Sequence, residues 1–142
     1  MAARRPVHLA LLPFALLAAG CAAPASPAGA PEAAIQGSVT YLQRIALTEG
    51  AVLEVVLLES AGADGPARAV AETAMDSPGQ VPIAFTLPYD PASIDPARAY
   101  SLSARIEDGG RAFVTPEPVP VLTGGAPATA EILLQPETPP QP

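Results

Sequence analysis

The sequence has few of the side chains that most enzymes use for chemistry. Lysine and tryptophan are absent from its 142 residues, and it contains one histidine, His8, and one cysteine, Cys21. Both lie in or beside an apolar N-terminal segment, so the rest of the chain has no imidazole base, no thiol nucleophile and no lysine to activate a serine. It also lacks the His and Cys ligands of zinc sites. These absences exclude most hydrolase, redox and zinc chemistry, and we expect neither a cofactor nor a bound metal.

Positive charge is scarce as well. All seven basic residues are arginines, against 14 Asp and Glu residues, and two of the arginines, Arg4 and Arg5, lie in the N-terminal segment. The chain beyond that segment keeps five arginines against 14 acids, a formal charge of −9. Nucleic acid phosphates and anionic lipid headgroups repel a surface of this charge. We therefore expect no nucleic acid partner.

The N-terminus has the pattern of a bacterial lipoprotein signal. The two arginines precede residues 6–19, which are apolar except for one histidine and are too few to span a bilayer. The segment ends in Leu17-Ala-Ala-Gly-Cys21, which resembles a lipobox with Ala18 where leucine is commonest. The alternative is an ordinary secretory signal with an unrelated cysteine. We predict that residues 1–20 are a signal peptide and that Cys21 carries the lipid.

Acylation at Cys21 would decide where the protein resides. Two or three acyl chains, at ~0.8 kcal/mol per buried methylene, hold a protein stably at a membrane. Lipoproteins that stay at the inner membrane typically carry Asp after the cysteine, whereas this chain has Ala22. The resemblance to that sorting rule implies the outer membrane of a Gram-negative cell, with the protein facing the periplasm. Residues 21–34, rich in Pro and Ala, would be the tether, and the Pro-rich residues 136–142 a disordered tail.

Residues 35–135, between the tether and the tail, alternate apolar and polar residues, which predicts β-strands. Pro82 and Pro88 cannot donate backbone hydrogen bonds, so the strand that holds them is predicted at a sheet edge. The alanine-rich residues 68–75 fit a strand or a helix. About seven strands predict an all-β fold, a small β-sandwich. The apolar sets that define the clearest strands are Ile35, Val39 and Tyr41; Leu53, Val55 and Leu57; Val81, Ile83, Phe85 and Leu87; Tyr100, Leu102, Ala104 and Ile106; and Ala130, Ile132 and Leu134.

Asp108-Gly109-Gly110 predicts a hairpin turn within this sandwich. A three-residue loop there would place Glu107 opposite Arg111 and Ile106 opposite Ala112.

Tyr100 and the residues before it indicate which sandwich this is. Ile94 stands six residues before Tyr100 and Pro96 four residues before it, and Tyr100 opens a strand. This resembles the tyrosine corner of immunoglobulin-like sandwiches, in which the phenol hydrogen-bonds to the backbone upstream. The alternative is an inward core tyrosine without such a bond. We favour the corner and hence an immunoglobulin-like β-sandwich.

Four segments, in their order and spacing, resemble a known family: residues 35–47 (IQGSVTYLQRIAL), 51–59 (AVLEVVLLE), 82–91 (PIAFTLPYDP) and 100–111 (YSLSARIEDGGR). The family is the YbaY-type lipoproteins, whose domain is also described as the YscW-type lipoprotein chaperone domain of type III secretion. The chain departs from the pattern in two turns. The resemblance implies a small periplasmic β-sandwich lipoprotein. Its secretion members act as pilotins, which help a secretin ring reach and assemble in the outer membrane.

The loop after residue 87 holds two carboxylates near a tyrosine, in Tyr89-Asp90-Pro91 and Asp95-Pro96. A glycosidase pair or a calcium site uses carboxylates. However, sugar-cleaving sites usually have aromatic platforms, and calcium loops carry oxygen ligands at alternate positions. Asp-Pro also forms turns, because the aspartate caps its own loop, and we favour this interpretation. If the loop contacts a partner, Tyr89 and Asp90 are the candidate residues.

We predict a non-enzymatic, monomeric lipoprotein that binds or chaperones an unknown protein of the cell envelope. A secretin is one candidate for that partner. The alternative is an inhibitor or regulator of an envelope enzyme, which would present acidic loops such as Tyr89-Asp90-Pro91 to a basic cleft. Two further function classes stay open: an enzyme that uses carboxylates alone, and a structural component of the envelope without a dedicated partner.

Overall fold

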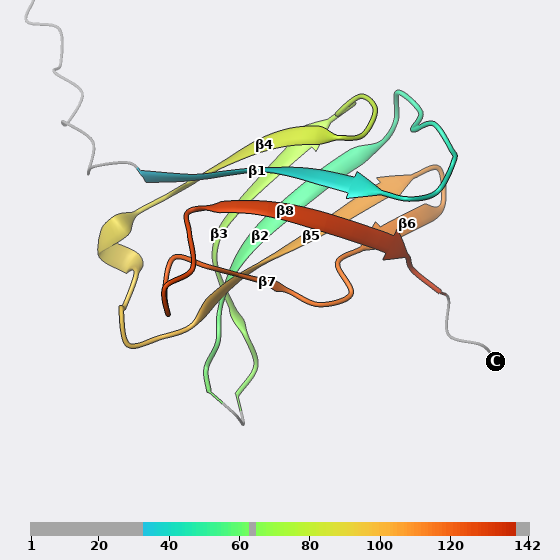
Figure 1. The fold of residues 1–142 in the computed structure, drawn as a ribbon. Helices are drawn as coiled ribbons and strands as arrows, with labels where there is room; N and C mark the ends of the chain where they lie inside the picture. The colour runs from blue at the N-terminus through green and yellow to red at the C-terminus, as the bar shows by residue number, and fades with distance from the viewer. Residues whose placement is uncertain (1–32, 63–64, 139–142) are drawn as a thin grey trace, which may run out of the picture.

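The fold is built from eight β-strands and one short helical turn. The computed structural model describes residues 33–62 and 65–138. Figure 1 shows the strands in chain order, and the connection from β4 to β5 carries the 3₁₀ turn η1. The elements are β1 (Ala33–Tyr41), β2 (Val52–Glu59), β3 (Arg68–Asp76), β4 (Ile83–Tyr89), η1 (Pro91–Ser93), β5 (Tyr100–Asp108), β6 (Arg111–Val114), β7 (Val119–Val121) and β8 (Thr129–Pro136).

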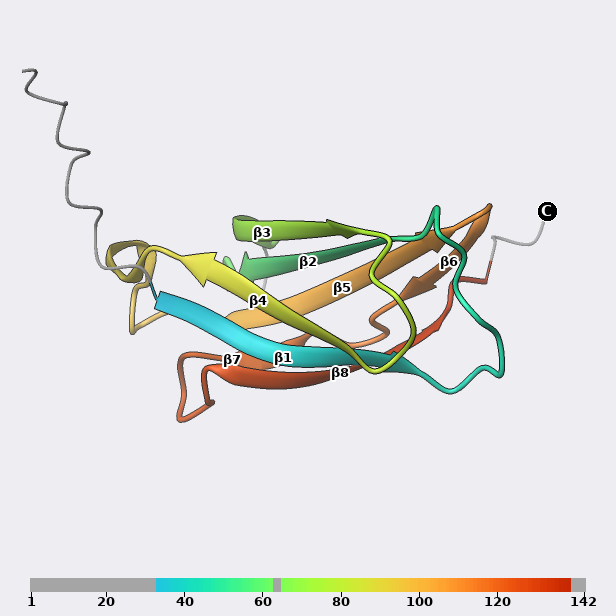
Figure 2. The ribbon, with the colours of Figure 1, turned by 90° about the horizontal axis from the view of Figure 1, so that it is seen from above.

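The strands form one sheet that folds over on itself into two layers. Hydrogen-bonded neighbours follow the order β3-β2-β5-β6-β8-β1-β4, and β7 pairs with β5 beside this path. Figure 2 shows β3, β2 and β5 in one layer and β4, β1 and β8 in the other. The two are joined where β6 pairs with the end of β8, through Phe113 opposite Pro136 and Val114 opposite Gln135. Every pairing is antiparallel except that of β1 with β8.

The predicted inner faces fill the space between the layers. Every residue of the five apolar sets is buried except Val81, which precedes β4 and is half-buried. Because side chains alternate across a strand, the polar residues between them lie on the outside. The all-β prediction is therefore confirmed, down to the inward face of each strand that was predicted with a clear alternation.

Residues 68–75, which fitted a strand or a helix, are a strand. The side chains of Ala71, Thr73 and Met75 are half-buried, whereas those of Glu72 and Ala74 are exposed. Alanine favours helices, but this segment is a strand because its backbone pairs with β2 along the whole length of β2. β4, which contains Pro88 and follows Pro82, lies at an edge as predicted, and β3 forms the opposite edge.

The predicted hairpin register is wrong by one residue. The loop has two residues, Gly109 and Gly110, with φ of 57° and 85°, so Asp108 pairs with Arg111. A two-residue loop with positive φ at both positions matches the twist of the flanking strands. It also places Phe113 opposite Ile106, so the aromatic ring points into the core. The predicted register would have turned that ring to solvent.

The folded part extends slightly beyond the predicted residues 35–135. β1 begins at Ala33, which pairs with Tyr89, and β8 ends at Pro136. The amide of Glu137 donates to the carbonyl of Ala112 at 2.8 Å. The prediction of about seven strands omitted the three-residue β7, because VPV is too short to show alternation.

Gly37, in the middle of β1, is required by close packing. A Cβ atom at this position would lie 2.1 Å from the carbonyl oxygen of Ala130 and 2.7 Å from the ring of Phe85. Both neighbours belong to the strands that flank β1, so only glycine leaves room for the ring above it.

Candidate functional site

The loop between β4 and β5, with its predicted contact residues, holds itself together through its own acids. Tyr89 ends β4 and packs half-buried against the core. The Asp90 carboxylate caps η1 by accepting the Ala92 amide at 2.8 Å. Five residues on, the Asp95 carboxylate accepts the Ala97 amide at 2.8 Å. Both carboxylates thus form the turns that Asp-Pro sequences favour. That Tyr89 and Asp90 contact a partner stays a prediction.

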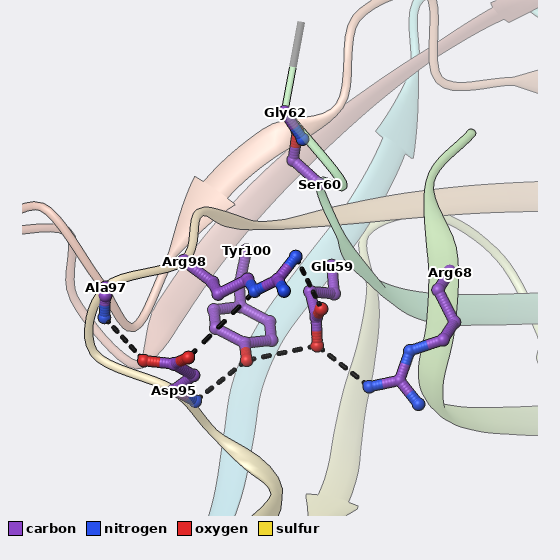
Figure 3. Close-up of polar contacts among 8 residues, drawn as sticks. All are labelled: Glu59, Ser60, Gly62, Arg68, Asp95, Ala97, Arg98 and Tyr100. Carbon is purple, nitrogen blue, oxygen red and sulfur yellow. Dashed lines mark hydrogen bonds and ion pairs between the residues drawn. The ribbon is translucent and has the colours of Figure 1, made fainter. Parts of the chain in front are cut away.

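Tyr100, at the start of β5, connects this loop to the neighbouring strand β2 (Figure 3). Its hydroxyl accepts the backbone amide of Asp95 at 2.9 Å, next to the expected Ile94, and donates to the carboxylate of Glu59 at 3.3 Å. Ile94 lies half-buried against the core, and Pro96 is exposed in the turn. The phenol is buried, and its bond to Glu59 is buried with it, whereas the bond from the Asp95 amide is part-buried. The hydroxyl therefore ties the β4–β5 loop to the end of β2.

Glu59 is the centre of this cluster, and its buried carboxylate is fully partnered. Arg68 approaches it at 2.9 Å and Arg98 at 3.5 Å, one from β3 and one from the loop. The hydrogen bond from Arg68, followed by the charges of the two guanidiniums and the bond from Tyr100, lowers the pKa of Glu59 against the opposing effect of burial. The sequence analysis did not single out Glu59. Glu59 occupies the next inward position of β2 after Leu53, Val55 and Leu57. This alternation could have identified Glu59 from the sequence.

A second buried acid, Asp108, lies at the other end of β5. Its side chain is 0% exposed and accepts the Thr48 hydroxyl and the Thr48 amide, while Arg111 pairs with its second oxygen. The Thr48 hydroxyl is the main reason that the pKa of Asp108 is lowered. Nearby, the ring of Tyr41 stacks on Phe113 at 4.8 Å, and its hydroxyl donates to the Ile45 carbonyl. These contacts close this end of the sandwich.

The arrangement of acids does not form a metal site among the described residues, where no three His, Cys, Asp or Glu side chains converge. Nor does any described helix have the length and apolarity to cross a membrane. Cys21, and with it the predicted signal peptide and most of the tether, lies outside the described residues.

The outer face of β1 and β8 carries a row of shallow hollows. Gln36, Ser38, Thr129 and Glu131 line its first part, and Leu42 and Leu133 its last. Leu42 is 77% and Leu133 42% exposed, which makes them the two most exposed large apolar side chains among the described residues. Apolar side chains gathered on a surface are a common feature of protein interfaces. Sequence analysis missed this face, because alternation identifies outward positions without showing which of them meet.

Comparisons with known proteins agree on one family. Residues 30–134 match the family described as "Type III secretion system lipoprotein chaperone (YscW)". The chain is similar to the uncharacterized lipoprotein YbaY of Escherichia coli K12, at 34% identity over 104 residues, which are 72% of this chain and 54% of that protein. It therefore spans about half the length of this curated relative. It is also similar to the structure of an alternative pilotin from the type II secretion system of Vibrio cholerae, at 36% identity and a TM-score of 0.71, over 76% of this chain and 99% of that one.

Proposed function

The chain belongs to the YscW lipoprotein chaperone family, and we propose that it is a non-enzymatic lipoprotein of the outer membrane that binds a secretin as a pilotin does. Its lipid would be attached at Cys21, and its folded domain would face the periplasm. The protein is an envelope lipoprotein by family, and the proposal adds the membrane, the orientation and the partner.

The extent of the likeness to the pilotin carries this proposal. The similarity covers 99% of the pilotin chain, so the folded domain described here corresponds to that pilotin as a whole. The family match over residues 30–134 spans all but the last two residues of the eight strands. A protein of similar fold and size, whose structure has been solved, is therefore named as a pilotin.

The buried acids of the described residues are engaged in internal contacts. Within residues 33–62 and 65–138, Glu59 and Asp108 are the two buried acids, and arginines and hydroxyl groups contact both carboxylates. Removal of one partner from such a pair would leave an uncompensated buried charge, so these acids are committed to contacts that hold strands and loops together. The acidic loop of the alternative proposal, inhibition of an envelope enzyme, uses its Asp90 carboxylate to cap η1. No contact among the residues that the structure describes favours that alternative.

Assembly of the secretin in the native host tests the proposal. In cells that lack the gene, we expect fewer secretin multimers in the outer-membrane fraction, with recovery when the wild-type gene is supplied. Cys21→Ser should fail to restore them, although the variant is made and exported in similar amount. Secretin multimers that assemble equally with and without the gene would overturn the proposal.

A further inference from the structure

β3 is an open edge of the sheet. It pairs with β2 alone and packs against β4, but no backbone hydrogen bond from Arg68–Asp76 reaches β4 or any other described residue outside β2. The other edge, β4, is protected by Pro88 in the strand and Pro82 just before it, because proline has no N–H to offer a further strand. β3 has no proline, and beyond a bulge at Val70 its pairing with β2 is regular from Ala71 to Asp76. It therefore presents a row of backbone donors and acceptors on which an extended chain can pair.

The side chains of β3 continue the two faces of the sheet up to this edge. Ala71, Thr73 and Met75 are half-buried on the inner side. Glu72 and Asp76 are exposed on the outer side. A strand added here would place alternate side chains toward the core and toward solvent.

The outer side of this edge is acidic, and its acids form no ion pair within the described part of the chain. Ala74 of β3 lies opposite Glu54 of β2, so Glu54 is a diagonal neighbour of both Glu72 and Asp76. None of these three acids has an ion-pair partner among the described side chains. Arg105 of β5 lies opposite Glu54 but forms its ion pairs with Glu107 and Glu137, each at 2.9 Å. A chain that pairs with β3 would gain from basic side chains on its outer face.

We propose that β3 is a docking edge for an extended, basic segment of a protein partner, which adds to the sheet as a further strand. The main-chain hydrogen bonds supply the affinity, and the alternating side chains supply the selectivity. The inference rests on the proposed function only in taking the occupant to be a protein.

A synthetic peptide tests the site without any knowledge of the natural partner. The probe is a capped eight-residue peptide of alternating Arg and Val, added to the full-length protein in neutral detergent. We expect saturable binding, and slower hydrogen exchange at backbone amides of β3. The control is the same peptide with two internal residues replaced by proline, which cannot pair as a strand and should not bind.

Charge reversal tests the predicted selectivity. The variant with Glu72→Lys and Asp76→Lys should bind the Arg-Val peptide about tenfold more weakly, since each cross-strand charge pair contributes roughly 0.2–1 kcal/mol and a like-charge pair opposes binding. It should instead bind a Glu-Val peptide. Glu72→Lys alone should also weaken binding, whereas its matched control, Glu117→Lys, makes the same change in net charge at an exposed residue away from β3 and should leave the affinity unchanged.

Three results would overturn the inference. The first is equal binding of the proline peptide, which would show simple charge attraction. The second is protection at β4 or β8 with β3 unaffected. The third is a stable dimer in which two β3 strands pair, detected by light scattering. Secretin assembly can fail while the peptide binds, so this experiment and the test of the proposed function fail separately.

Discussion

Tyr100→Phe is the sharpest test of how the sandwich holds the β4–β5 loop. The substitution removes one oxygen and leaves the buried ring in place, so packing is nearly unchanged. It deletes the acceptor of the Asp95 amide, at 2.9 Å, and one donor to Glu59, at 3.3 Å. Glu59 keeps both arginines, so the main loss falls on the Asp95 amide.

The size of the effect follows from that amide. A buried donor that loses its acceptor costs about 1–3 kcal/mol, whereas an amide that water can reach costs less. We therefore expect Tyr100→Phe to lower the free energy of unfolding by about 1–3 kcal/mol. For a domain of about 100 residues, each kcal/mol lowers the melting temperature by roughly 4–8 °C.

Ser101→Ala is the matched control, one residue along on the outer face of β5. Ser101 is half-buried, and its hydroxyl makes no hydrogen bond with a described residue, so the change should stay within about 0.5 kcal/mol. Urea midpoints of the two variants give the comparison, provided that their m-values match. If Tyr100→Phe is as silent as Ser101→Ala, the hydroxyl does not tie the loop to the sheet, and the tyrosine-corner interpretation fails.

Three further outcomes are expected. Gly37→Ala should destabilise the domain by about 1–3 kcal/mol or more in thermal unfolding, because the added methyl group meets the Ala130 carbonyl; Gly50→Ala, with no atom closer than 3.8 Å, should have little effect. Since the folded-state pKa of Asp108 is lowered, the stability that it contributes is complete above its unfolded pKa of about 3.9 and is lost as pH falls further. Urea midpoints should therefore decline below about pH 4, and Asp108→Asn should make that decline shallower. A fatty-acid label should enter the wild-type protein and leave Cys21→Ser unlabelled; equal labelling would end the lipoprotein interpretation.

Alternation predicted most of this fold because one physical cause dominates it. An apolar residue such as Leu53 or Ile132 is buried in the core. Because side chains alternate along a strand, its neighbours on either side point away from the core. Pro88 indicated an edge for the same kind of local reason, since the missing N–H cannot be supplied by any tertiary contact. Residues 68–75 gave no such answer, because their small side chains fit either period and only the pairing with β2 decides.

The hairpin shows where local rules give a wrong result. Asp-Gly-Gly fits loops of two or three residues, and the choice depends on which of Ala112 and Phe113 reaches the core. The register with Phe113 inward buries a large ring and stacks it on Tyr41, on a strand far away in sequence. A contact of that range is invisible in the turn itself.

The same alternation that buries the apolar residues also buries the two acids, and this could have been predicted. Glu59 continues the inward phase of β2, and Asp108 continues that of β5. An acid at an inward position of a strand must accept hydrogen bonds or stand where the strand ends, because burial of an unpaired carboxylate is energetically costly. Both acids stand at the last residue of their strand, where exposed arginines, Arg68 and Arg111 among them, can reach inward from the rim. An inward acid at a strand end therefore predicts a polar clamp, even though its partners are known only from the fold.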